Sequence, residues 1–229
     1  MKIKNAVVAG VAALALGTAQ AALLDQYFEP TSLGVSAGLG VFMGRDVSRA
    51  QTFAVGITGQ LTGIDLLVDE YQSNADLSVQ LWSTVNGIPN GSSNQPLAQG
   101  WLLASTVDSD WRNISNFYHV DFGATSPYVT VGENIAIVLH TDSTTGGWGL
   151  KGDYSSSIYG NRETYAYGAS FEKGNAGNSW IPTPSIGPVD FGFRTYVDVA
   201  PIPEPETYAM MLAGLGLLGV FARRRKQNG

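Results

Sequence analysis

The segment Asp76-Leu-Ser-Val-Gln-Leu-Trp-Ser83 alternates apolar and polar side chains, which is the pattern of a β-strand with one buried face. One face of this strand carries Leu77, Val79 and Leu81, and the other carries Ser78, Gln80 and Trp82. A second segment, Ile135-Ala-Ile-Val-Leu139, is apolar throughout, as a central strand covered on both faces would be. Together the two segments predict a layered β-fold.

Short strand-like runs continue on both sides of these segments, and helical periodicity is almost absent between Leu23 and Ala200. We expect strands at residues 51–58, 61–68, 77–83, 97–107, 117–122, 128–131, 135–141, 148–152, 164–171 and 191–199. Turn residues such as Asn86-Gly87 separate the runs. Residues 22–49 are ambiguous, and their glycines favour an edge strand with loops over a helix. This spacing predicts an all-β, antiparallel sandwich.

Composition narrows the classes of function. The chain has no cysteine, which excludes disulfides, thiolate metal sites and a cysteine nucleophile. Without the charges of the two ends, the middle of the chain keeps 17 acidic and 7 basic residues, a net charge of about −10. Such a surface repels a phosphate backbone, so we expect no nucleic-acid partner.

Residues 1–21 have the pattern of a secretory signal peptide. Lys2 and Lys4 give a positive start, residues 6–17 are apolar or small, and Ala19-Gln20-Ala21 is a small-x-small cleavage site. An uncleaved anchor is the alternative, but the apolar run is short for a membrane span. We therefore expect signal peptidase to cut after Ala21 and to leave an extracytoplasmic domain at residues 22–200.

Residues 201–229 form a separate tail. Its apolar run from Tyr208 to Ala222 predicts a single transmembrane helix at about 207–222, although 15 helical residues rise only about 22 Å. A basic end follows and sets the orientation, because basic residues beside a membrane segment stay in the cytoplasm. These topology residues are Arg223, Arg224, Arg225 and Lys226. The main domain is then expected outside the cytoplasm.

A proline-rich motif precedes the helix, and Pro203-Glu204-Pro205 holds the backbone extended. From these residues alone, a simple linker before an ordinary anchor is an equal alternative. The order of this tripeptide, a Gly/Leu-rich helix and Arg223–Lys226 resembles the PEP-CTERM sorting signal of Gram-negative bacteria. The resemblance implies processing by a membrane-embedded exosortase that recognises Pro203, Glu204 and Pro205. It also implies tethering to the inner membrane during sorting, then a place at the cell surface or in an exopolysaccharide or biofilm matrix.

The middle of the chain resembles a jelly-roll module that recurs in bacterial surface proteins with different anchors. The motifs that carry this resemblance are Gln51–Val55, Leu61–Leu66, Leu77–Leu81, Gly87–Gly91, Ile135–Leu139 and Phe191–Tyr196. They are structural motifs, so the resemblance implies a jelly-roll-like sandwich and transfers no catalytic or ligand residue.

The residues that often carry catalysis form no recognisable motif. The two histidines, His119 and His140, lie on expected strands without a nucleophile motif beside them. With 17 acids in the middle of the chain, a pair of carboxylates at glycosidase spacing arises by chance. We therefore expect no catalytic residues and no enzyme, and keep a glycan hydrolase as a distant alternative.

We also expect no cofactor, with one reservation about a metal ion. Two groups of oxygen-bearing side chains lie near expected turns and leave a structural Ca²⁺ open as an alternative. They are Asp65 with Asp69 and Glu70, and Asp108 with Asp110 and Asn113.

Six aromatic residues fall close together in a part of the chain rich in Gly, Ser and Asn. They are Trp148, Tyr154, Tyr159, Tyr165, Tyr167 and Trp180. Exposed rings can stack on sugars, whereas buried rings would pack the second sheet, and both interpretations stay open. Alternation places Tyr165 and Tyr167 on one face. Three hypotheses follow: a protein that binds exopolysaccharide through these aromatics, a structural matrix protein without a specific ligand, and, distantly, a hydrolase.

Overall fold

The computed structural model describes most of the chain. The described residues are 21–30, 41–43, 47–90, 95–109, 116–154, 165–174, 179–182, 189–199 and 205–227. The chain divides into a compact unit at residues 22–200 and a second unit that consists of the two terminal segments.

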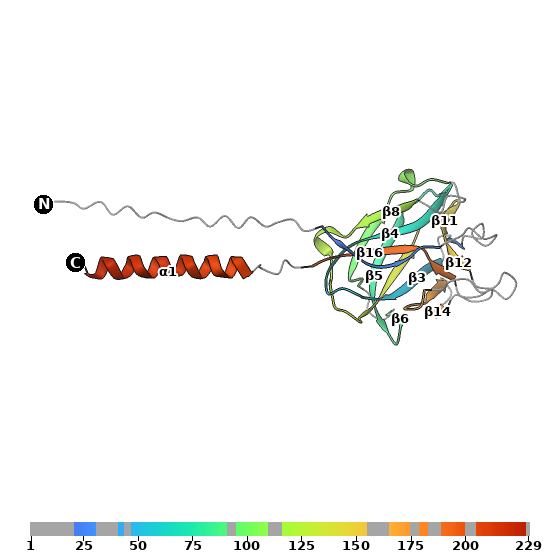
Figure 1. Ribbon diagram of the computed structural model, residues 1–229. Helices are drawn as coiled ribbons and strands as arrows, with labels where there is room; N and C mark the ends of the chain where they lie inside the picture. Colours follow the sequence, from blue (N-terminus) through green and yellow to red (C-terminus); the bar gives the residue numbers. More distant parts are fainter. Residues whose placement is uncertain are drawn as a thin grey trace. The chain divides into compact units, whose positions relative to one another are not determined.

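The compact unit is built from two mostly antiparallel sheets whose inner faces share one apolar core (Figure 1). In the first sheet the described strands follow the order β1-β16-β4-β11-β2, with β8 and β9 also paired to β4. These strands are β1 (Leu23–Phe28), β16 (Phe193–Asp198), β4 (Gly59–Tyr71), β11 (Gly147–Leu150), β2 (Val41–Met43), β8 (Phe117–Asp121) and β9 (Tyr128–Val129).

The second sheet follows the order β14-β13-β3-β10-β5-β6, with β7 also paired to β5. These strands are β14 (Ile181–Pro182), β13 (Ser170–Gly174), β3 (Val47–Ala54), β10 (Asn134–His140), β5 (Leu77–Val85), β6 (Ile88–Pro89) and β7 (Ala98–Leu102). A small separate ribbon pairs β12 (Gly152–Tyr154) with β15 (Val189–Phe191). The predicted antiparallel sandwich is confirmed in architecture, and it is consistent with a jelly-roll-like module.

Strand β5 packs as its alternating pattern predicts. Leu77, Val79 and Leu81 are fully buried in the core between the sheets. Strand β10 lies between β3 and β5 and is covered on both faces, as its uninterrupted apolar sequence predicts. Its Ile135, Ile137 and Leu139 enter the main core, whereas Ala136 and Val138 belong to a second apolar cluster on the outer face.

The strand bounds differ from the prediction where a backbone interaction interrupts the apolar pattern. The run expected at 148–152 divides at Lys151, because its N–H bonds to Leu67 O while its carbonyl accepts from the Gly192 N–H. The strand expected at 97–107 stops at Leu102, and a 3₁₀ turn follows at Ala104–Thr106. The ambiguous segment 22–49 contributes β1, β2 and the start of β3.

The terminal unit contributes helix α1 (Pro205–Gln227) (Figure 1). Among the described residues, no helix combines the length and the mean hydropathy that a membrane span requires, so the transmembrane segment predicted at 207–222 finds no support there. The signal peptide expected at 1–21 lies almost wholly outside the described residues, as do Pro203 and Glu204.

Candidate functional site

The outer face of β5 carries the side chains that its alternation turns away from the core. Because Leu77, Val79 and Leu81 point inward, Ser78, Gln80 and Trp82 point outward. Strand register then adds two neighbours from β7, which places Gln99 opposite Gln80 and Trp101 opposite Ser78. On the other side, β10 places His140 opposite Ser78. We call the set Ser78, Gln80, Trp82, Gln99, Trp101 and His140 the tryptophan face.

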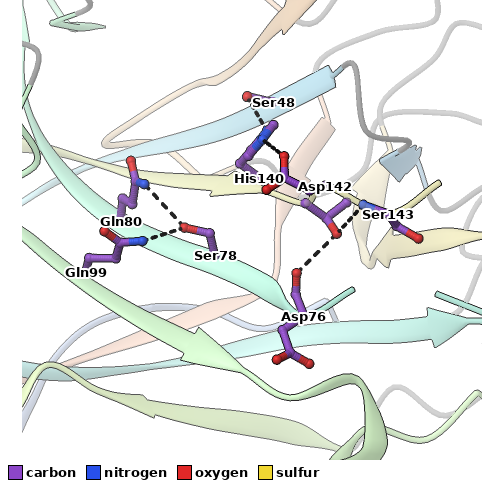
Figure 2. Close-up of polar contacts among 9 residues, drawn as sticks. Ser48, Asp76, Ser78, Gln80, Gln99, His140, Asp142 and Ser143 are labelled. Carbon is purple, nitrogen blue, oxygen red and sulfur yellow. Dashed lines mark hydrogen bonds and ion pairs between the residues drawn. The ribbon is translucent and has the colours of Figure 1, made fainter. Parts of the chain in front are cut away.

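Hydrogen bonds hold the amides of the tryptophan face in one arrangement. The Trp82 indole Nε1 donates to Gln80 Oε1 over 2.8 Å. Gln80 Nε2 and Gln99 Nε2 both donate to Ser78 Oγ, over 3.3 and 3.2 Å (Figure 2). Ser78 is only 3 % exposed, so its buried hydroxyl holds the half-exposed Gln80 amide and the exposed Gln99 amide in place. The amide groups are thereby oriented before any ligand arrives.

The two tryptophans lie on either side of the Gln80 and Gln99 amides. Trp101 is 56 % exposed, and Trp82 is half-buried against the outer apolar cluster. Trp82 lies level with Leu97, four residues along β7 from Trp101, because Leu81 pairs with Ala98. At the rise of a β-strand, four residues separate the backbone positions of the two tryptophans by roughly 14 Å along the strand direction. That spacing suits an extended ligand of several linked units.

His140 links the tryptophan face to the start of β3. Ser48 Oγ lies 3.1 Å from His140 Nδ1, and Asp142 Oδ1 lies 3.1 Å from His140 Nε2 (Figure 2). The order serine, histidine, aspartate is that of a hydrolytic triad, in which the acid is buried behind the histidine. Here the Asp142 side chain is 87 % exposed. The contact therefore has the character of a surface hydrogen bond, and the prediction of no catalytic residues stays a prediction.

The predicted aromatic group does not form one platform. Trp148 is fully buried in the core and Tyr165 is also buried, which favours the core-packing alternative for these two rings. Trp180 packs against the outer apolar cluster. Tyr154 belongs to β12, and Tyr159 lies outside the described residues. Of the six, Tyr167 is the one shown to be largely exposed, at 67 %.

Tyr165 and Tyr167 lie in a turn before β13 and not on the strand predicted at 164–171. Their rings meet edge to face with centroids 6.0 Å apart, so they contact each other without sharing a strand face. This turn and β1 line an open surface pocket of about 490 Å³ that we call the tyrosine pocket. Its lining residues are Asp25, Gln26, Tyr27, Phe28, Tyr165, Ala166 and Tyr167.

Two carboxyl groups near the tyrosine pocket have altered acidity. Burial raises the pKa of Asp25, although the Gly56 and Ile57 N–H groups and the Thr195 hydroxyl act in the opposite direction. Burial also raises the pKa of Asp190, whose Oδ2 accepts a hydrogen bond from the Tyr165 N–H over 3.0 Å. The pKa of the Tyr165 phenol is raised by burial and further by the Asp25 charge.

The first group of expected calcium ligands is divided between other partners. Asp65 accepts from the Tyr196 hydroxyl over 2.6 Å and lies 2.7 Å from His119 Nδ1, and Arg194 is also near it. Glu70 accepts a hydrogen bond from the Ser73 N–H. Of the second group, Asp110 and Asn113 lie outside the described residues. Within the described ranges no three His, Asp or Glu side chains converge as a metal centre needs, and a calcium ion stays a prediction.

The tryptophan face was missed as a site, although part of its signal is in the sequence. Trp82 stands on the polar side of the alternation in Asp76–Ser83. Gln99 and Trp101 likewise alternate with the buried Ala98, Gly100 and Leu102. An exposed tryptophan between glutamines on neighbouring strands would have identified the surface. The pairing of β5 with β7, which brings these residues together, is not visible in either strand alone.

Comparison with known proteins identifies the tail. Residues 201–226 match the PEP-CTERM protein-sorting motif, which confirms the resemblance noted at Pro203–Lys226. No curated protein matches the chain. Among solved structures, the chain is similar to the cysteine protease and lectin-like domains of Cwp84, a surface layer associated protein of Clostridium difficile. That match has 15 % identity and a TM-score of 0.45, and it covers 68 % of this chain and 32 % of the other, so the chain spans about a third of that structure's length.

Proposed function

We propose that this protein binds a neutral exopolysaccharide at the cell surface through the tryptophan face. The PEP-CTERM motif indicates an exosortase-sorted protein that is exported and reaches the surface or the extracellular space after processing at the membrane. The observation that carries the proposal is the pair Trp82 and Trp101 on either side of hydrogen-bonded glutamines.

The chemistry of this surface suits a polysaccharide chain. Aromatic rings offer apolar faces on which the C–H faces of sugars stack, while oriented amides exchange hydrogen bonds with hydroxyls. Because Ser78 already holds Gln80 and Gln99, binding requires little further ordering of these side chains. A spacing of roughly 14 Å between the backbone positions of the two tryptophans favours a chain over a single sugar.

The overall charge supports a neutral ligand over a polyanion. The domain carries 17 acidic and 7 basic residues, and the exposed Asp142 stands beside His140 at the border of the tryptophan face. A negative surface repels acidic glycans through the same field that repels nucleic acids. Binding to a neutral chain should then depend weakly on salt.

The test is affinity electrophoresis of the purified protein through gels that contain neutral or acidic polysaccharides, including those of the producing cell. Trp101→Ala should weaken binding about tenfold or more, which corresponds to about 1.4 kcal/mol. Tyr128→Ala is the matched control, because Tyr128 is even more exposed than Trp101 but lies on β9 of the other sheet. Equal retardation of Trp101→Ala and the native protein would overturn the proposal. An absence of retardation in every gel would favour the structural-matrix hypothesis.

A further inference from the structure

The tyrosine pocket has features of a binding site and shares no residue with the tryptophan face. It lies between β1 of the first sheet and the turn that leads into β13 of the second. Its volume of about 490 Å³ falls within the range of pockets that hold small molecules. Tyr167 and Tyr27 are both more than half exposed, so aromatic surface is open to solvent at this point.

Hydrogen bonds to neighbouring residues hold the polar side chains of the pocket in place. The Tyr165 hydroxyl donates to Gln26 Oε1 over 2.9 Å, which orients the Gln26 amide, and the amide nitrogen lies beside Gly56. Asp25 Oδ1 accepts from the Gly56 N–H over 2.9 Å, and the Thr195 hydroxyl donates to Asp25 Oδ2 over 3.3 Å. A donor and an acceptor are thereby held at the side of an aromatic surface, which is what recognition of vicinal hydroxyls requires.

The exposed ring of the pocket rests on the core. Tyr165 packs edge to face on Phe193 with centroids 5.2 Å apart, and Tyr167 in turn packs on Tyr165. Tyr165 also contacts Phe28 of β1. This stack limits the motion of Tyr167 and reduces the entropy that a ligand would have to remove.

We propose that the tyrosine pocket is a second saccharide site, which takes a single sugar residue at a chain end or branch. This inference takes from the proposed function only the class of ligand, a polysaccharide. The pocket lies at the turn that leads into β13, and Trp101 lies on β7, with β3, β10 and β5 between these two strands. Four strand spacings amount to roughly 19 Å, so one sugar residue cannot occupy both sites. One molecule would then engage a polysaccharide at two points.

The test uses isotope-labelled protein and backbone amide NMR, with glucose, galactose, mannose and N-acetylglucosamine as separate probes. At least one sugar should produce saturable shifts at Ala166 and Tyr167. Tyr167→Ala and the near-isosteric Asp25→Asn should each weaken that binding about tenfold or more. Tyr128→Ala should leave it unchanged. The inference is overturned if no probe gives saturable shifts at these amides, or if both pocket variants bind as the native protein does.

The same experiment separates this inference from the proposed function. Trp101→Ala should weaken retardation by the polymer about tenfold or more and leave the monosaccharide shifts at Tyr167 intact. Shifts that persist while Trp101→Ala still binds the polymer would support the pocket and overturn the role of the tryptophan face. Retardation that depends on Trp101, without shifts at the pocket, would support the tryptophan face and overturn the role of the pocket.

Discussion

The indole Nε1 of Trp148 donates a hydrogen bond to the carbonyl oxygen of Ala75 over 3.1 Å. Trp148 lies on β11 of the first sheet, and Ala75 lies in the turn that leads into β5 of the second. The bond therefore joins the two layers at one end of the sandwich, in a place where the ring itself is fully buried. A ring in this position stabilises the fold and contacts no ligand.

Trp148→Ala should destabilise the domain by about 3–5 kcal/mol, because it removes a buried aromatic side chain and leaves a cavity. Chemical denaturation followed by fluorescence or circular dichroism measures this loss. Trp101→Ala is the control, and at an exposed position it should change the free energy of unfolding by no more than about 0.5 kcal/mol. Equal destabilisation by the two substitutions would contradict the burial difference.

Gln80→Met should weaken polysaccharide binding while the fold remains stable. The substitution keeps the length of the side chain but removes the acceptor for the Trp82 indole and the donor to Ser78. We expect a loss of about 0.5–1.5 kcal/mol in binding free energy, the usual size of one hydrogen bond. Gln60→Met on β4 is the matched control, because Gln60 is exposed on the other sheet and should bind normally. Native affinity in Gln80→Met would show that the orientation of Trp82 does not matter.

The buried carboxyl of Asp190 should give a measurable pH dependence. Burial raises its pKa, so its contribution to stability is complete below the ordinary aspartate pKa and declines as pH rises through the folded value. Asp190→Asn removes that titration. The Tm of the native protein relative to Asp190→Asn should therefore fall as pH increases from about 3.5 to 7, beginning near the ordinary carboxyl range. A relative Tm that rises over this interval would show that folding lowers the pKa of Asp190, contrary to the expectation.

Substitution of two glycines with positive φ distinguishes the stability cost of backbone strain from that of steric crowding. Gly146 has φ 60°, and a Cβ placed there would lie 1.9 Å from the Tyr71 carbonyl oxygen. Gly132 has φ 84° with open space around it. Gly132→Ala should cost about 1–2 kcal/mol from conformation alone. Gly146→Ala should cost clearly more, since the backbone of β4 must also move. Thermal unfolding of both variants measures the difference, and equal Tm values would show that the backbone at Tyr71 yields without cost.

Glu204→Ala should block processing of the tail without altering export. Glu204 is the central residue of the Pro-Glu-Pro tripeptide within the matched sorting motif. Glu206→Ala changes the same charge outside the tripeptide and should be processed normally. Immunoblots of membrane and surface fractions report the result, with the unprocessed form expected to accumulate in the membrane fraction for Glu204→Ala. A native surface yield for that variant would contradict recognition through Glu204.

Local patterns predicted the strands well and predicted the proposed binding surfaces poorly. The alternation in Asp76–Ser83 and the apolar run Ile135–Leu139 place their side chains as the structure shows them. A strand pattern depends on neighbouring residues, and those are visible in the sequence. Trp148 shows the limit: Gly149 beside it lies against Asp69, so β11 is covered on both faces and no residue of it is available to a ligand.

Tyr165 and Tyr167 show why the second site could not be predicted. Their alternation resembles that of a strand, but the N–H of Tyr165 bonds to Asp190, and a Cβ at Gly168 would lie 1.8 Å from the Thr52 carbonyl oxygen. These two long-range contacts hold the segment as a turn. The pocket then depends on β1, more than a hundred residues away in the chain, whose register with β16 shifts between Leu24 and Tyr27. No window of local sequence contains that information.

Strand β16 connects the domain to the sorting tail, and this gives the fold a mechanical property. It is hydrogen-bonded to β1 along one edge and to β4 along the other, and Val197 near its end pairs with both Leu23 and Leu61. A pull on the tail would therefore load two ladders of backbone hydrogen bonds together, instead of peeling a strand from the margin of the sheet. A force on the C-terminus would have to break both ladders at once before the last strand could leave the sheet.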